Sequence, residues 1–83
     1  MLTGVQIRSA RAALGWSVQE LADRAGVAAK TIMRLESVVG VPQSRTGTLL
    51  DIKAALEAAG IEFIGTPEDR PGIRLSRPSK TGE

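Results

Sequence analysis

Apolar residues recur at intervals of three and four over most of the first 59 positions of this 83-residue chain. Such spacing is typical of amphipathic helices, which bury one face and leave the other in solvent. A single domain of this length buries a small core, so a partner or a second copy of the chain would add stability. The pattern predicts four helices, with approximate bounds Gly4 to Leu14, Val18 to Ala25, Ala28 to Ser37 and Thr46 to Ala59.

Capping residues mark where the first two helices begin. Thr3 and Gln6 have the spacing of a capping box, in which each side chain bonds the backbone N–H of the other residue. Ser17 and Glu20 repeat this spacing at the start of the second helix. Gly26 then ends that helix, because glycine adopts the left-handed conformation without steric cost.

The pattern changes after the fourth helix. Residues 61–64 and 73–75 are short runs of β-type residues, and the stretch 65–72 between them holds two prolines. These features predict an antiparallel hairpin, in which Glu62 and Arg74 face each other on the outer side. The remaining residues are polar and typical of a disordered tail. The chain is therefore expected to divide into a helical domain over 1–60, a hairpin over 61–75 and a tail over 76–83.

The composition narrows the possible chemistry. The chain has no Cys and no His, which excludes disulfide frameworks, thiolate or imidazole metal sites and His-based acid–base catalysis. Its serines have no histidine to activate them and it has no glycine-rich phosphate loop, so we expect no enzyme, no catalytic residue and no cofactor. No apolar run approaches the roughly 20 residues of a membrane span, and no secretory signal is recognisable. We therefore expect a cytoplasmic protein without a membrane partner.

The net charge of +2 is distributed unevenly. Residues 1–37 carry five basic and three acidic side chains, whereas the rest of the chain carries six of each. The excess of positive charge in the first half favours a polyanionic partner, although a basic face also occurs on proteins that bind nothing charged.

The second and third predicted helices, joined by a glycine turn, resemble the DNA-binding unit of the phage-repressor-like (Cro/C1, XRE-type) transcriptional regulators. The residues that match the pattern of that family are Leu21, Ala22, Ala25, Gly26, Val27, Ile32 and Leu35. The resemblance covers about residues 3–59. It implies a mainly α fold, a lambda-repressor-like helix-turn-helix bundle of four helices followed by the β-hairpin.

The same resemblance implies a sequence-specific transcriptional regulator, such as a repressor, that binds double-stranded DNA in association with the nucleoid. The matching residues are core positions, so alone they indicate a fold more than an activity. The other function that we consider is a protein-interaction module, such as the antitoxin of a toxin–antitoxin pair or an anti-repressor. No small-molecule ligand is evident.

Within the resemblance, the third helix enters the major groove and its outward row contacts the bases. The base-reading positions are Ala29, Lys30, Met33 and Arg34. Lys30 and Arg34 are the guanine-contacting candidates, and the alternative for each is a phosphate contact. The phosphate-contacting positions are Ser17, Gln19, Thr31, Ser37 and Arg45. Thr31 is expected to be half-buried, whereas Arg8 and Arg24 are expected to be plain solvated charges.

Three further positions follow from the comparison with the family. Arg11 and Glu36 occupy the places of a buried ion pair, which would be structural because it fixes the direction of the third helix. Val18 stands where a phosphate-binding glutamine is usual, so Gln19 is expected to substitute for it. Ala28 replaces the usual Ser or Thr cap of the third helix, at a cost of about 1 kcal/mol.

Members of this family usually bind near-palindromic operators as twofold dimers. The hairpin lies outside the family core, which makes it the expected dimerisation element. Alternation along its first strand leaves Ile64 exposed on the outer face, a liability at an unpaired strand edge in a monomer. The expected interface residues are Phe63, Ile64 and Ile73. Alternatively, the hairpin only covers its own fourth helix, and the chain dimerises through that helix or only on DNA.

Overall fold

The computed structural model describes residues 2–75, which form four helices and one two-stranded antiparallel hairpin. The elements are α1 (Gly4–Leu14), α2 (Val18–Ala25), α3 (Ala29–Glu36), α4 (Thr46–Ala58), β1 (Ile61–Thr66) and β2 (Asp69–Leu75). All six elements were predicted, and each helix end lies within one residue of its predicted position. The tail predicted over 76–83 lies outside the described residues.

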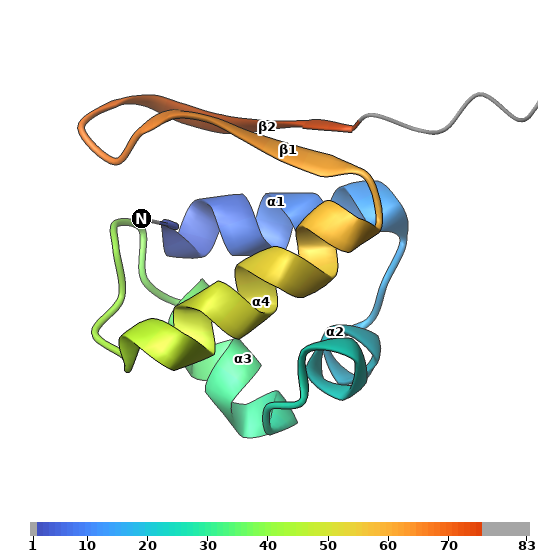
Figure 1. Ribbon diagram of the computed structural model, residues 1–83. Helices are drawn as coiled ribbons and strands as arrows, with labels where there is room; N and C mark the ends of the chain where they lie inside the picture. The colour runs from blue at the N-terminus through green and yellow to red at the C-terminus, as the bar shows by residue number, and fades with distance from the viewer. Residues whose placement is uncertain (1, 76–83) are drawn as a thin grey trace, which may run out of the picture.

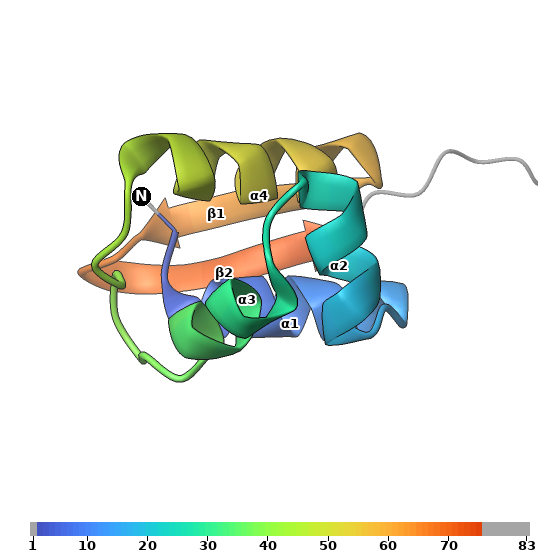
Figure 2. The same cartoon turned by 90° about the horizontal axis from the view of Figure 1, so that it is seen from below.

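Two helices form the middle of the molecule. The hairpin lies across one side of α1 and α4, while α2 and α3 lie on the opposite side (Figure 1). Seen from below, β2 runs along α1 and β1 runs along α4 (Figure 2). The core between these layers consists of Leu2, Ile7, Ala10, Leu21, Ala22, Ile32, Leu35, Leu49, Ile52, Leu56 and Ile61.

The start of α1 is fixed by the predicted capping box. The Gln6 N–H donates to Thr3 Oγ1 at 3.0 Å, and the Thr3 N–H donates to Gln6 Oε1 at 2.9 Å.

At the start of α2 only half of the predicted capping box forms. Ser17 Oγ accepts from the Glu20 N–H at 3.1 Å, but the Glu20 carboxylate accepts from Arg24 Nε at 2.6 Å rather than closing a box. An arginine one turn further on thus competes successfully with the backbone for this carboxylate.

The side chain of Gln6 also ties α1 to the hairpin. Its Nε2 group donates to the carbonyl oxygens of Gly72 at 2.9 Å and Ile64 at 3.4 Å. Gln6 is only 4% exposed, and a buried amide left without partners would be destabilising. Its oxygen therefore caps the helix while its nitrogen holds both strands.

The hairpin is longer than the sequence predicted. Its strands continue through most of the stretch expected as a loop, and only Pro67 and Glu68 form the turn. The register shifts between Ile64 and Thr66, and Gly65 between them has φ of 75°, which is a bulge that lets pairing resume beyond it. Pro71 is tolerated because proline, which lacks an N–H, fits edge strands and bulges.

Candidate nucleic-acid interface

The turn between α2 and α3 brings these two helices together around a shared core. Gly26 has φ of 73° and its N–H donates to the Ala22 carbonyl at 2.9 Å, which closes α2 with a left-handed residue. Ala22 is 2% exposed, and Ile32 and Leu35 are fully buried. One face of α3 is thereby held against the molecule, and its opposite face is left free. As predicted, Ala28 makes no side-chain cap at the start of α3.

The outward row of α3 consists of three of the four predicted base-reading residues. Lys30 and Arg34 are exposed, and Met33 is 55% exposed. Ala29 was expected in this row, but it is half-buried and packs against the core. The physical reason is helical periodicity: Ala29 lies three residues before Ile32 and therefore shares its flank of the helix.

Arg34 does not extend freely from α3. Its Nη1 group donates to the backbone carbonyl of Gln43, in the loop between α3 and α4, at 3.1 Å. The carbonyl of Arg34 itself accepts from Ser37 Oγ at 2.7 Å. The end of α3 is therefore hydrogen-bonded both to its own last turn and to the following loop.

The predicted phosphate-contacting residues occupy three different parts of the surface. Ser17 is exposed at the N-terminus of α2, where unpaired N–H groups and the helix dipole favour an anion. Gln19 is exposed and donates to Asp23 Oδ1 at 2.9 Å, one turn along α2. Thr31 is half-buried, as expected, and Arg45 is exposed just before α4, where its side chain makes no cap bond.

The structure contains the ion pair expected between Arg11 and Glu36. Arg11 Nε and Nη2 donate to the two carboxylate oxygens of Glu36 at 2.8 and 3.0 Å, and Arg11 Nη1 donates to the Trp16 carbonyl at 2.8 Å. The Glu36 side chain is 8% exposed and that of Arg11 is 19% exposed. The hydrogen bond to Glu36 raises the pKa of Arg11, although its partial burial acts in the opposite direction. This bidentate ion pair connects α1 with the last residue of α3.

Arg24 is exposed, as expected of a solvated charge, but its side chain also makes two contacts. Its guanidinium lies 4.4 Å from the centre of the Trp16 ring, and its Nε is bonded to Glu20. The cation–π contact and the ion pair hold this side chain along α2. A partner was available in the sequence, because Glu20 lies four residues before Arg24 and such pairs meet on a helix surface.

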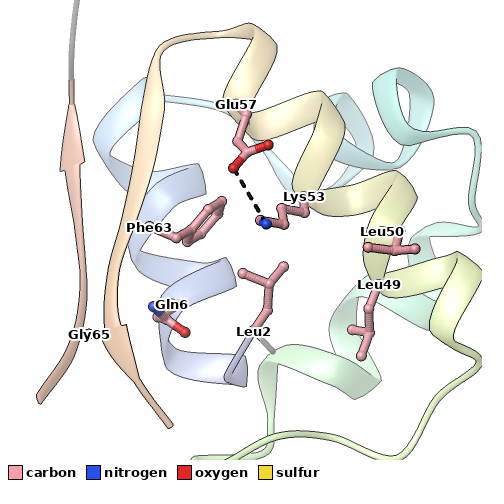
Figure 3. A pocket seen from close by; sticks show the side chains of 8 residues that line it. All are labelled: Leu2, Gln6, Leu49, Leu50, Lys53, Glu57, Phe63 and Gly65. Atoms are coloured by element: carbon pink, nitrogen blue, oxygen red, sulfur yellow. Dashed lines mark ion pairs between the residues drawn. The ribbon is translucent and has the colours of Figure 1, made fainter. Parts of the chain in front are cut away.

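A hollow that the sequence did not predict lies between the hairpin and the helices α1 and α4 (Figure 3). Its volume is about 250 Å³. Leucine side chains and Phe63 form its apolar part, and Lys53 and Glu57 form an ion pair across 3.7 Å beside them. The one sequence signal was Leu50, a large apolar residue at an outward position of α4, where it is 54% exposed. The residues around the hollow are Leu2, Gln6, Leu49, Leu50, Lys53, Glu57, Phe63 and Gly65.

The hairpin separates the three residues expected at a dimer interface. Phe63 and Ile73 face each other across the strands, and both are half-buried against the core of their own chain. Ile64 lies on the outer side, opposite Gly72, and is half-buried rather than fully exposed. On the same outer side Arg74 Nη1 and Glu62 Oε1 form the expected pair at 3.4 Å. Of the three residues, Ile64 alone lies on the outer side of the hairpin.

A scan against protein-family models gives no match for this chain, and a search of curated proteins gives none either. Over residues 2–75, no helix is both long and apolar enough to cross a membrane. The same part of the chain contains no cluster of three carboxylates that could hold a metal ion.

Proposed function

We propose that this chain is a sequence-specific, double-stranded DNA-binding regulator of the lambda-repressor-like helix-turn-helix class. In this proposal α3 enters the major groove and presents Lys30, Met33 and Arg34 to the base edges. Lysine and arginine bind guanine through their N–H donors, and methionine can contact the methyl group of thymine. The observation that carries the proposal is this exposed row on a short helix whose opposite face is buried.

The way in which α3 is held supports the proposal. A helix that reads bases must keep a fixed direction, because base contacts depend on side-chain placement within less than an ångström. Ile32 and Leu35 fix α3 to the core, and the Arg11–Glu36 pair fixes its C-terminal end to α1. The N-terminus of α2, with Ser17, is a suitable phosphate contact that would set the depth of α3 in the groove.

A second copy of the chain is part of the proposal. One unit of this size covers one half-site, and a twofold dimer would recognise a near-palindrome. The outer face of the hairpin is the proposed contact surface, since Ile64 places an apolar side chain there beside the Glu62–Arg74 pair. The unpaired edges of the two-stranded sheet offer backbone groups to a second hairpin.

The deciding experiment is selection of bound sequences from random duplex DNA, followed by titration of the selected duplex at several salt concentrations. With about four phosphate contacts per chain, and therefore about eight for a dimer, the affinity of the dimer should fall roughly 10⁴-fold between 50 and 200 mM salt. Single-stranded DNA of the same sequence is the control and should bind more weakly. The proposal is contradicted if no sequence is enriched, or if affinity stays flat over this range for every duplex tested.

The alternative is a protein-interaction module. The observation that favours it is a set of exposed valines in the loop between α3 and α4, of which Val39 is 79% exposed and Val38 and Val41 are each more than one-third exposed. Apolar side chains at such exposure are common in surfaces that bind another protein. In that case the chain would bind a protein partner and enrich no duplex sequence in the selection.

A further inference from the structure

The loop between α3 and α4 is fixed beside the outward row of α3. On one side, Arg34 Nη1 donates to the Gln43 carbonyl at 3.1 Å. On the other side, Pro42 is buried and the Gly4 N–H of α1 donates to the Gly40 carbonyl at 2.9 Å. Because the loop is anchored on both sides, its backbone is held in one position, and its exposed side chains start from fixed points.

Gln43 is the residue of this loop whose backbone the α3 row contacts directly. Its side chain is exposed, and its neighbour Pro42 is buried. A glutamine amide carries both a donor and an acceptor, the combination that pairs with the N7 and N6 groups of adenine. The Gln43 side chain therefore has the groups needed to bind adenine. The contact with Arg34 also places the Gln43 backbone within hydrogen-bonding distance of a proposed base-reading side chain.

We propose that Gln43 is a further specificity-determining residue, which reads a base pair beside those contacted by α3, and that Arg34 is its positioning residue. This inference rests on the proposed function. The bond to Gln43 uses one N–H of Arg34, and its guanidinium has five. The remaining donors stay available for a base or a phosphate. The proposed DNA surface thus consists of two elements joined by this hydrogen bond, rather than of α3 alone.

The coupling between Arg34 and Gln43 gives a specific expectation for each of four variants. Gln43→Ala should relax the preference at one base pair by about 5- to 150-fold, the range of a lost bidentate contact. Lys30→Ala should relax a different base pair and leave that of Gln43 unchanged. Arg34→Ala should relax its own base pair and also that of Gln43, because the loop loses its anchor to α3. Gln43→Glu keeps the size of the side chain but has no donor for adenine N7, so it should lose the same preference.

The test is selection from random duplex DNA with the whole chain and each of the four variants at one salt concentration, with thermal melting of each protein alongside. The matched charge control is Gln19→Glu, which adds the same negative charge on α2 and should weaken all sequences nearly equally. The ratio of enrichment between two bases within one selection is unaffected by a change that weakens all sequences equally. All four variants change exposed side chains, so their melting temperatures should stay close to that of the unchanged protein.

Three outcomes would overturn the inference. Gln43→Ala could keep the full preference of the unchanged protein, or it could weaken all sequences equally, as a phosphate contact would. Arg34→Ala could leave the preference at the base pair of Gln43 intact, which would remove the positioning role. Failure of the proposed function is distinct from all three, because the unchanged protein itself would then enrich no sequence.

Discussion

Arg11 in α1 and Glu36 at the end of α3 are joined by two parallel hydrogen bonds of 2.8 and 3.0 Å. The pair links two helices that are 25 residues apart in the chain. Arg11 also donates to the Trp16 carbonyl, so all three nitrogens of its guanidinium have an acceptor. This arrangement fixes the end of the proposed recognition helix relative to the rest of the core.

The main effect of removing the Arg11 side chain should be a lower free energy of unfolding, rather than the loss of a DNA contact. Arg11→Ala leaves the Glu36 carboxylate, with a side chain 8% exposed, without its counter-charge. The expected loss in the free energy of unfolding is roughly 3–5 kcal/mol, measured by urea denaturation. Lys53→Ala is the control, because the Lys53–Glu57 pair is about half-exposed and should contribute less than about 1 kcal/mol. Equal denaturation midpoints for the two variants would contradict this reading of the pair.

Gly4 should tolerate no side chain, whereas Gly47 should. A Cβ on Gly4 would overlap the backbone carbonyl oxygens of Leu35 and Val38, while Gly47 in α4 has open space around it. Gly4→Ala is therefore expected to destabilise the protein by about 1–3 kcal/mol through overpacking. Gly47→Ala is expected to be neutral or to stabilise by about 0.5–1 kcal/mol, since alanine favours the helix. Thermal melting of both variants measures the contrast, and a stable Gly4→Ala variant would show that α1 can move away from the loop.

Lys30 and Ser17 should affect DNA binding in different ways. Lys30→Ala removes a proposed base contact and should reduce the preference at one base pair by about 5- to 150-fold. Ser17→Ala removes a proposed phosphate contact and should weaken every sequence by a similar factor. Competition between the selected duplex and single-base variants measures both effects. Lys30 would be a phosphate contact instead if Lys30→Ala weakened the binding of all duplexes alike and reduced the slope of log affinity against log salt concentration by about one.

Ile64 should decide the oligomeric state if the hairpins pair. We expect the unchanged protein to sediment as a dimer at tens of micromolar and Ile64→Glu to sediment as a monomer, because a buried carboxylate at the interface would lack a partner. Val39→Glu is the control, since Val39 is 79% exposed in a different part of the surface. A monomeric unchanged protein, or an Ile64→Glu variant that stays fully dimeric, would exclude the outer face of the hairpin as the interface.

Local interactions explain what the sequence could predict. The Thr3–Gln6 box spans three residues, and Gly26 ends α2 through its own backbone conformation. The buried flank of α3 follows from the spacing of Ile32 and Leu35. Each of these features depends on residues within one turn of helix, so no knowledge of the rest of the fold is needed. The Arg11–Glu36 pair is different, because it was expected from resemblance to a family and not from spacing.

The tertiary structure decided which partner each multifunctional side chain takes. Gln6 has a free amide nitrogen once its oxygen caps α1, and only the docked hairpin supplies the Gly72 carbonyl, 66 positions away. Arg34 likewise meets the Gln43 carbonyl, nine positions away, only where the folded loop lies beside α3. A polar group with several possible acceptors takes whichever the packed fold brings within about 3 Å, and the distances between distant segments are not encoded in any local pattern.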